Sequence, residues 1–369
     1  MKKEYKYASI FFAIIAIGII SISYFYDEVD LKRNTTDDTI VSDKKFLRSS
    51  PELKEVSGYI NTSSEEIKQM INGNVVLYDF WTYSCINCIR TLPYLTAWDE
   101  KYGDQGLVIV GIHTPEFEFE KEYENVVFAT KKFGVKYPVL QDNEKEIWND
   151  FKNRYWPRKY IADHEGYIRF DHIGEGAYKE TEEVIQLLLA ERSETTGKTL
   201  EKKNFVKLSE FEHAPIRTPE LYFGFSFAEG RNQLGNEEGF SKNKVVTYQL
   251  PEQFREHYFY VEGMWKNNND GMMLVSDSGK IVLNFKAKQV NIVASNEAVL
   301  KITYDGNLMS SEIRGDDVLP DGTVNISEPR LYNLIESAQE GLHEIVIKIE
   351  NPGFEVFTFT FGGFSLGIM

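Results

Sequence analysis

The chain has 369 residues, and 41 Lys and Arg against 57 Asp and Glu give a net charge of −16. Its length allows roughly two domains of about 150 residues each, and its acidity argues against nucleic-acid binding, which needs a basic surface. The only two cysteines, Cys85 and Cys88, exclude a disulfide scaffold and a four-thiolate zinc site, and a hydrophobic share of 42% excludes a disordered chain.

The charge and hydropathy pattern of residues 1–26 predicts a membrane anchor. An uncharged run occupies residues 8–26, and at 1.5 Å per residue it is about long enough to span a bilayer core. Lysines before the run and acidic residues after it favour a cytoplasmic N-terminus and an extracytoplasmic body. The alternative is a cleaved signal peptide and a secreted body, although signal-peptide cores usually run only ~7–15 residues. Residues 27–50 are polar and predict a flexible spacer.

Residues 51–192 alternate between strand-like and helix-like stretches. Short apolar runs there are typical of buried parallel strands, and the stretches between them have helical periodicity. Strands are expected at 75–80, 107–112, 160–162 and 167–172, and helices at 126–133 and 181–191. Alternation of this kind predicts an α/β fold with a central sheet.

Residues 193–218 are polar and predict a linker, after which residues 219–369 change in character. Short apolar stretches recur in this second part, separated by turn signals such as Asp305-Gly306. The candidate strands are 222–227, 245–250, 258–261, 281–285, 290–293, 298–304, 344–349 and 356–361. About eight strands without strong helices predict an all-β, jelly-roll-like sandwich.

The motif that carries chemistry is the Cys-x-x-Cys pair, which follows a predicted strand and opens a predicted helix. A helix N-terminus presents unpaired N–H groups and a partial positive charge, which stabilise a thiolate. Cys85 is therefore predicted to be the attacking thiolate, and Cys88, one turn further, the buried thiol that resolves a mixed disulfide. A structural disulfide is the alternative, but a bridge that closes so small a loop stabilises a fold only weakly.

Three further residues are predicted to support the cysteines. Asp79, in the preceding strand, is predicted to be a buried carboxylate that exchanges a proton with Cys88. Pro93 is predicted to kink the helix. Pro157, which follows Trp156, is predicted to be a cis-proline that faces the cysteines and leaves a backbone edge for an extended substrate.

The residues that flank the motif give weaker indications. Trp81 is expected to pack beside the site, and Tyr83 and Ser84 are candidates for lining a substrate groove. His113 and Glu116 follow a predicted strand, so they either border the active-site face or are solvated loop groups. The six histidines show no ligand-like pairing, so neither a metal nor another cofactor is expected.

The pattern over residues 79–93, Asp-Phe-Trp-x3-Cys-x2-Cys-x4-Pro, resembles the thioredoxin superfamily. Together with 111–116 (GIHTPE) and 153–157 (NRYWP), it is similar in particular to the exported region of the DipZ family. In that region a TlpA-like thioredoxin domain precedes a β-sandwich that resembles carbohydrate-binding modules, to which 218–224 (TPELYFG) and 359–362 (FTFG) are similar. The resemblance implies a thioredoxin-like fold and a thiol–disulfide oxidoreductase.

The resemblance also implies partners and a location. DipZ proteins typically begin with a multi-helix membrane domain that passes electrons across the membrane, whereas this chain has one hydrophobic segment, so a separate membrane electron donor is expected. Protein disulfides are the expected clients, with apocytochrome c as the family-level expectation. Ile86-Asn87, between the cysteines, contains no histidine that would stabilise a thiolate, so a reducing protein is predicted. The predicted location is the cell membrane, with a single pass and an extracytoplasmic body.

Two other functions stay open at this point. A thiol peroxidase is one, because residues 82–85 present the Thr-x-x-Cys of peroxiredoxins, although Tyr78 stands where that motif has proline. The other is a surface protein whose second domain binds envelope glycans, with the first domain as a scaffold. A glycan platform needs exposed, coplanar aromatic rings, whereas aromatic residues at alternating strand positions are interpreted as core.

Overall fold

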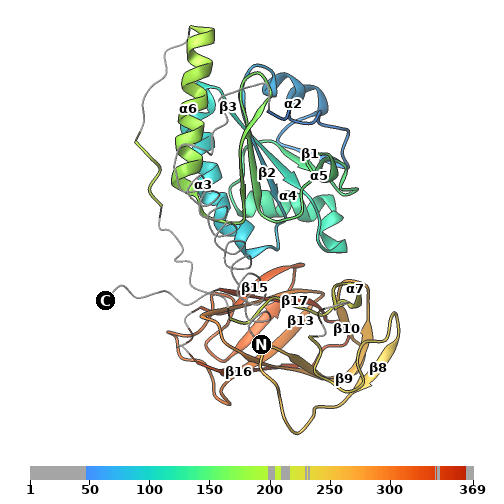
Figure 1. Cartoon of the computed structure of the whole chain (residues 1–369). Coiled ribbons are helices and arrows are strands. Elements are labelled where there is room, and N and C mark those ends of the chain that lie inside the picture. Colours follow the sequence, from blue (N-terminus) through green and yellow to red (C-terminus); the bar gives the residue numbers. More distant parts are fainter. Residues whose placement is uncertain are drawn as a thin grey trace, which may run out of the picture.

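The structure is a computed structural model and describes residues 47–197, 204–208, 217–228, 231, 233–336, 338 and 341–362. The predicted anchor, most of the predicted spacer and much of the predicted linker lie outside the described residues. Among the residues that are described, no helix combines the length and the apolar character needed to cross a bilayer. The described chain forms a mixed six-stranded sheet and an antiparallel eleven-stranded sheet, which lie in separate parts of the molecule (Figure 1).

The six-stranded sheet has the order β1-β4-β3-β2-β5-β6. Its strands are β1 (Gly58–Ile60), β2 (Val75–Trp81), β3 (Leu107–His113), β4 (Val139–Gln141), β5 (Arg158–Ala162) and β6 (Ile168–Ile173). Strands β2, β3 and β4 run parallel, whereas β5 runs antiparallel to both β2 and β6. Every residue of β2 is buried, which fits a central strand that is covered on both faces.

Helices cover both faces of this sheet and complete what we call the α/β domain. They are α2 (Ser64–Ile71), α3 (Ile86–Tyr102), α4 (Tyr123–Lys132), α5 (Glu146–Asp150) and α6 (Tyr178–Thr196), with short 3₁₀ helices η2 (Gly103–Gln105) and η3 (Glu118–Lys121). Alternate side chains of β2 point to opposite faces: Leu77 packs in the cluster that includes α3, α4 and α6, and Tyr78 packs in the cluster that includes α2 and α5. The predicted α/β fold with a central sheet is confirmed.

The eleven strands of the second sheet form what we call the all-β domain. They are β7 (Leu221–Tyr222), β8 (Val245–Tyr248), β9 (Phe259–Asn267), β10 (Met272–Leu274), β11 (Gly279–Phe285), β12 (Gln289–Ser295), β13 (Ala298–Tyr304), β14 (Thr323–Ile326), β15 (Arg330–Ile335), β16 (His343–Ile349) and β17 (Glu355–Gly362). Strand β9 pairs with β11 through its first half and with β10 through its second half, so the strands join in one sheet. Strands β14 and β15, at opposite ends of the strand order, contribute to the same apolar core, so the sheet curls around it.

The strand predicted at 222–227 is wrong beyond Tyr222. The chain turns there into a short helix, α7 (Phe225–Ala228). Gly224 permits this turn, because a Cβ atom at this position would lie 2.4 Å from the backbone of Asp270. The amides of Phe225 and Ser226 donate to the carbonyls of Asn268 and Asn269, which holds the turn against that loop.

The two domains meet through aromatic side chains. Phe117 and Phe119 of the α/β domain pack on Phe357 of the all-β domain, with ring centroids 5.3 and 4.7 Å away. Tyr222 donates a 2.9 Å hydrogen bond to Glu116, which also crosses the interface. Figure 1 shows the all-β domain at one end of the α/β domain, where one end of α3 is directed toward it.

Candidate active site

Cys85 lies at the start of α3, directly after the turn that follows β2. It is the N-cap residue of the helix, and its Sγ accepts a 3.3 Å hydrogen bond from the backbone N–H of Cys88. Cys85 is half-buried, whereas Cys88 is 1% exposed, and both are free thiols. Only Cys85 is therefore placed to meet a substrate, and the N-terminal N–H groups of α3 are placed to stabilise its thiolate.

The Cys88 thiol lies beneath Cys85 in an environment that opposes its ionisation. Burial, followed by the neighbouring Cys85, raises the pKa of Cys88 well above its usual value. A thiol with a raised pKa holds its proton at neutral pH, so Cys88 attacks a disulfide only when a base removes that proton.

Asp79 and Lys159 form a buried pair of titratable groups beside this thiol. The two residues lie opposite each other on β2 and β5, and they are 1% and 0% exposed. Burial raises the pKa of Asp79 to about 7, against the charge of Lys159. Burial likewise lowers the pKa of Lys159 to about 8, against the charge of Asp79. Both Asp79 and Lys159 interact electrostatically with Cys88, so Asp79 is a carboxyl group that titrates near neutral pH close to the buried thiol.

Sequence reasoning missed Lys159, although one signal points to it. It directly precedes the apolar residues 160–162 of a short strand and lies two residues after Pro157. Lys159 and Ile161 are two residues apart in this strand, so their side chains share one buried face of the sheet, where a charged group needs a partner. Its Nζ donates to the carbonyl of Gly174 at 3.3 Å.

Glu120 holds the turn that carries Cys85. Its buried carboxylate accepts hydrogen bonds from the hydroxyl and the amide of Ser84, at 2.6 and 3.3 Å. It also accepts from the amides of Glu116 and Phe117, at 2.7 and 3.0 Å. One carboxylate thus ties the residue before the nucleophile to the segment that packs on the all-β domain. Sequence reasoning had no signal for it, because 116–124 contains five glutamates.

We expect Glu120→Ala to lower the free energy of unfolding by roughly 2–5 kcal/mol, because it leaves buried N–H and O–H donors without an acceptor. Chemical denaturation followed by tryptophan fluorescence measures this change. The matched control is Glu118→Ala, whose exposed side chain makes an ion pair with Lys121 and is expected to cost less than about 1 kcal/mol. Equal losses in the two variants would contradict the role assigned to Glu120.

The rings of Trp81, Tyr83 and His113 are buried and pack on one another. His113 packs edge-on to Trp81, with centroids 5.2 Å apart, and stacks on Tyr83 at 5.6 Å. Burial lowers the pKa of His113 to about 3, so its imidazole is neutral near pH 7. The interpretation of His113 as a solvated loop group is therefore wrong. Trp81 is fully buried, in keeping with a packing residue.

Two other flanking residues, Ser84 and Glu116, are held by hydrogen bonds to different partners. The hydroxyl of Ser84 is bound to Glu120, and Ser84 is 2% exposed, so it does not line an open groove. Burial, followed by the charges of Glu220 and Glu120, raises the pKa of Glu116 to about 8. Because Glu116 accepts from Tyr222, it belongs to the domain interface rather than to a solvated loop.

The Trp156–Pro157 peptide bond is cis, as predicted. Arg158, the next residue, pairs with Phe80 near the end of β2, so Pro157 lies at the same end of the sheet as Cys85. Trp156 packs against Trp148 in a tilted arrangement, with ring centroids 4.3 Å apart. Pro93 is exposed within α3, which continues past it to Tyr102. Across the described ranges, no group of three or more histidine, cysteine or carboxylate side chains is arranged to hold a metal ion.

Comparisons with known proteins agree with this geometry. Residues 73–168 match the family described as thioredoxin-like, and residues 218–362 match the family described as thioredoxin like C-terminal domain. The chain is 30% identical over 316 residues to protein DipZ of Mycobacterium bovis, in an alignment that covers 85% of this chain and 43% of DipZ. The chain thus spans less than half the length of that relative.

Two other relatives match shorter stretches of the chain. Thiol-disulfide oxidoreductase YkuV of Bacillus subtilis is 26% identical over 147 residues, which cover 40% of this chain and 98% of YkuV. NHL repeat-containing protein 2 of Bos taurus is 37% identical over 128 residues, which cover 34% of this chain and 18% of that protein. With a buried and a half-buried thiol at the start of α3, these likenesses place residues 73–168 in the thioredoxin-like family and residues 218–362 in the family described as thioredoxin like C-terminal domain, and the likeness to DipZ extends over both.

Proposed function

We propose that the protein reduces disulfide bonds in exported proteins, with Cys85 as the nucleophile and Cys88 as the resolving thiol. The observation that carries this proposal is the half-exposed Cys85 at a helix N-terminus above a buried Cys88 with Asp79 beside it. An attacking thiolate needs access to the substrate, whereas a resolving thiol needs proximity to the first sulfur and a base.

The exchange proceeds in two balanced steps. The Cys85 thiolate attacks one sulfur of the client disulfide, which forms a mixed disulfide and releases the other client sulfur as a thiolate. Cys88 then loses its proton to Asp79 and attacks the Sγ of Cys85. The second client thiolate leaves, so the client gains two electrons and the protein is left with a Cys85–Cys88 disulfide.

The protein's location and partners follow as part of the proposal. The uncharged run at residues 8–26 supports a membrane anchor with an extracytoplasmic body. A separate membrane protein would then supply electrons to the oxidised cysteines. Protein disulfides are the proposed clients, including the Cys-x-x-Cys of apocytochrome c, because the likeness to DipZ extends over both domains.

A second candidate function, glycan binding, is favoured by one observation on the all-β domain. A cavity of about 680 Å³ lies between the domains and is lined by amides, carboxylates and two aromatic rings. These include Phe119 and Phe357 with Asn268, Asn269, Asp270 and Asn296. Amides and carboxylates bind hydroxyl groups, so an envelope glycan held there would position the enzyme near its clients. A glycan array probed with the whole exported region tests this function, and a lack of binding to every glycan on the array would contradict it.

We expect the Cys85–Cys88 couple to have a midpoint potential below about −150 mV, well under that of a strong oxidant. A strong oxidant has a strongly stabilised thiolate at its attacking cysteine, whereas Ile86 and Asn87, between the cysteines, offer no positive charge to Cys85. Equilibration with glutathione buffers, followed by thiol alkylation, measures the potential. The matched variant is Asn87→His, in which a nearby imidazolium stabilises the thiolate and raises the potential. A wild-type potential above about −150 mV would contradict the reducing direction.

A further inference from the structure

One short segment of the all-β domain reaches the active-site helix. Pro329, Arg330 and Leu331, at the start of β15, line a cavity of about 20 Å³ together with Tyr83 and Ile89 of the α/β domain. Tyr83 precedes the nucleophile by two residues, and the amide of Ile89 donates to the carbonyl of Cys85 at 3.0 Å. The segment 329–331 therefore contacts the surface within one helical turn of Cys85.

The space between the two domains at this contact is small. The remaining wall of this cavity comes from Phe128, Ala129, Lys132 and Phe133 on and after α4. A cavity of about 20 Å³ holds roughly one water molecule, so no side chain of a client can enter between the domains here. Residues 329–331 of the all-β domain thus cover the surface between α4 and the residues that flank Cys85 in the sequence.

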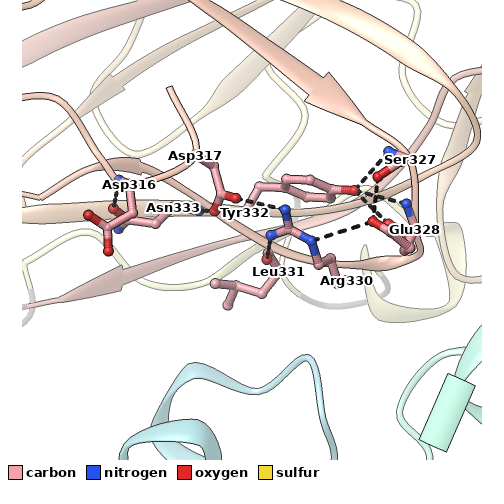
Figure 2. A network of polar contacts seen from close by, with 8 residues as sticks. All are labelled: Asp316, Asp317, Ser327, Glu328, Arg330, Leu331, Tyr332 and Asn333. Atoms are coloured by element: carbon pink, nitrogen blue, oxygen red, sulfur yellow. Dashed lines mark hydrogen bonds and ion pairs between the residues drawn. The ribbon is translucent and has the colours of Figure 1, made fainter. Parts of the chain in front are cut away.

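Hydrogen bonds of Tyr332 fix the turn that precedes the segment. Its hydroxyl donates to the carbonyl of Glu328 at 2.7 Å and accepts from the amides of Ser327 and Glu328, at 3.0 and 3.2 Å (Figure 2). A buried ring that makes three such bonds holds the backbone of the turn in one conformation.

Charged side chains fix the strand on the other side of the turn. Asp317 accepts from the guanidinium of Arg330 and from the amide of Asn333, both at 2.7 Å. The guanidinium also lies 3.7 Å from the centre of the Tyr332 ring and donates to the carbonyl of Leu331. Figure 2 shows the Leu331 side chain on the side of β15 that is directed toward the α/β domain.

The all-β domain contacts α3 at a second place. Arg90, one turn beyond the first helical residues, donates to Gln289 at the start of β12. Leu331 and Gln289 thus lie over the first turns of α3 from two strands of one sheet. Cys85 itself is half-buried, and Pro157 lies at the same end of the sheet as this thiol.

We propose that residues 329–331 form a specificity wall that selects the clients of Cys85. The wall leaves a one-sided slot, through which an extended chain with a disulfide reaches the thiolate. A disulfide held flat on the surface of a folded protein cannot approach without striking Leu331. This inference rests on the proposed disulfide reduction and names the residue that restricts it.

The test compares two substrates in the full exported region. One is a linear peptide in mixed disulfide with glutathione, and the other is folded insulin; the measured quantity is the ratio of kcat/KM for insulin to that for the peptide. For Leu331→Ala we expect this ratio to rise about tenfold, on the scale of losing several methylene groups from a specificity contact. Asp317→Asn, which loosens the wall without changing Leu331, is expected to raise the ratio in the same direction.

The control is Val299→Ala, an exposed position on β13, which should keep the wild-type ratio. An unchanged ratio in both Leu331→Ala and Asp317→Asn would overturn the proposed wall. This includes the case in which kcat/KM rises by the same factor for both substrates. A wild-type protein that reduces neither substrate would instead contradict the proposed function, so the two failures are distinguishable.

Discussion

Replacing Cys85 with serine is expected to lower the rate of disulfide reduction by more than about 10³-fold, the scale of losing an enzyme's nucleophile. A serine hydroxyl does not ionise near neutral pH, so the helix N-terminus has no thiolate to stabilise. Turnover of a peptide disulfide with a chemical reductant as electron donor measures the loss. The half-exposed position of Cys85 and its N-cap geometry are the reasons for assigning the effect to this residue.

Cys88→Ser is the matched variant, since it changes the same atom in the buried thiol. Turnover is also expected to stop, but the first step is expected to remain, so one equivalent of client thiol should appear in a burst. If Cys88→Ser showed no burst and Cys85→Ser did, the two roles would be reversed.

Asp79→Asn is expected to slow resolution of the mixed disulfide by about 10²-fold, the usual contribution of a positioned base. The pKa of Asp79 is about 7 because the carboxylate is buried, so its basic form increases as the pH rises through 7. The wild-type resolution rate should therefore rise through that pH and level off above it. Stopped-flow release of a fluorescent thiol from a preformed Cys85 mixed disulfide measures the step, and the asparagine variant should lack this inflection.

Lys159→Met provides an independent check on the same pair. The charge of Lys159 lowers the pKa of Asp79, so its removal should raise that pKa and move the inflection to a higher pH. An inflection that stays in place in Lys159→Met, or that survives in Asp79→Asn, would show that another group is the base.

The motif at the end of β2 could be predicted from sequence because its chemistry is local. An apolar strand, the cysteine spacing and a helix N-terminus follow one another along the chain, so the sequence alone predicts the roles of Cys85 and Cys88. The cis bond before Pro157 was likewise predicted from its place in the sequence pattern, and the structure has it.

The rest of the site depends on contacts between distant segments. Lys159 lies opposite Asp79 only because of the register in which β5 pairs with β2. Glu120 differs from the neighbouring glutamates only in accepting a hydrogen bond from Ser84, in the turn before Cys85. His113 looked like a loop residue, yet it lies at the end of a strand whose side chains are all buried. Burial, which decides each of these roles, is a property of the packed molecule.

The second domain shows the same limit. Its strands were recognisable from turn spacing, but the helix at Phe225–Ala228 was not, because the loop that holds it lies over forty residues further along the chain. Leu331 gave no signal in the sequence, since its significance comes from packing beside Tyr83 and Ile89 of the other domain.

Mass-spectrometric mapping of conjugates trapped by the Cys88→Ser protein tests the central claim most directly. This variant and Cys85→Ser are expressed in parallel. Acid then stops thiol exchange, free thiols are alkylated, and the cysteine that carries each client is identified. The division of roles predicts clients bound through Cys85 in the first variant and little or no trapping in the second. Equal recovery of the same clients on Cys88 of the Cys85→Ser protein would contradict it.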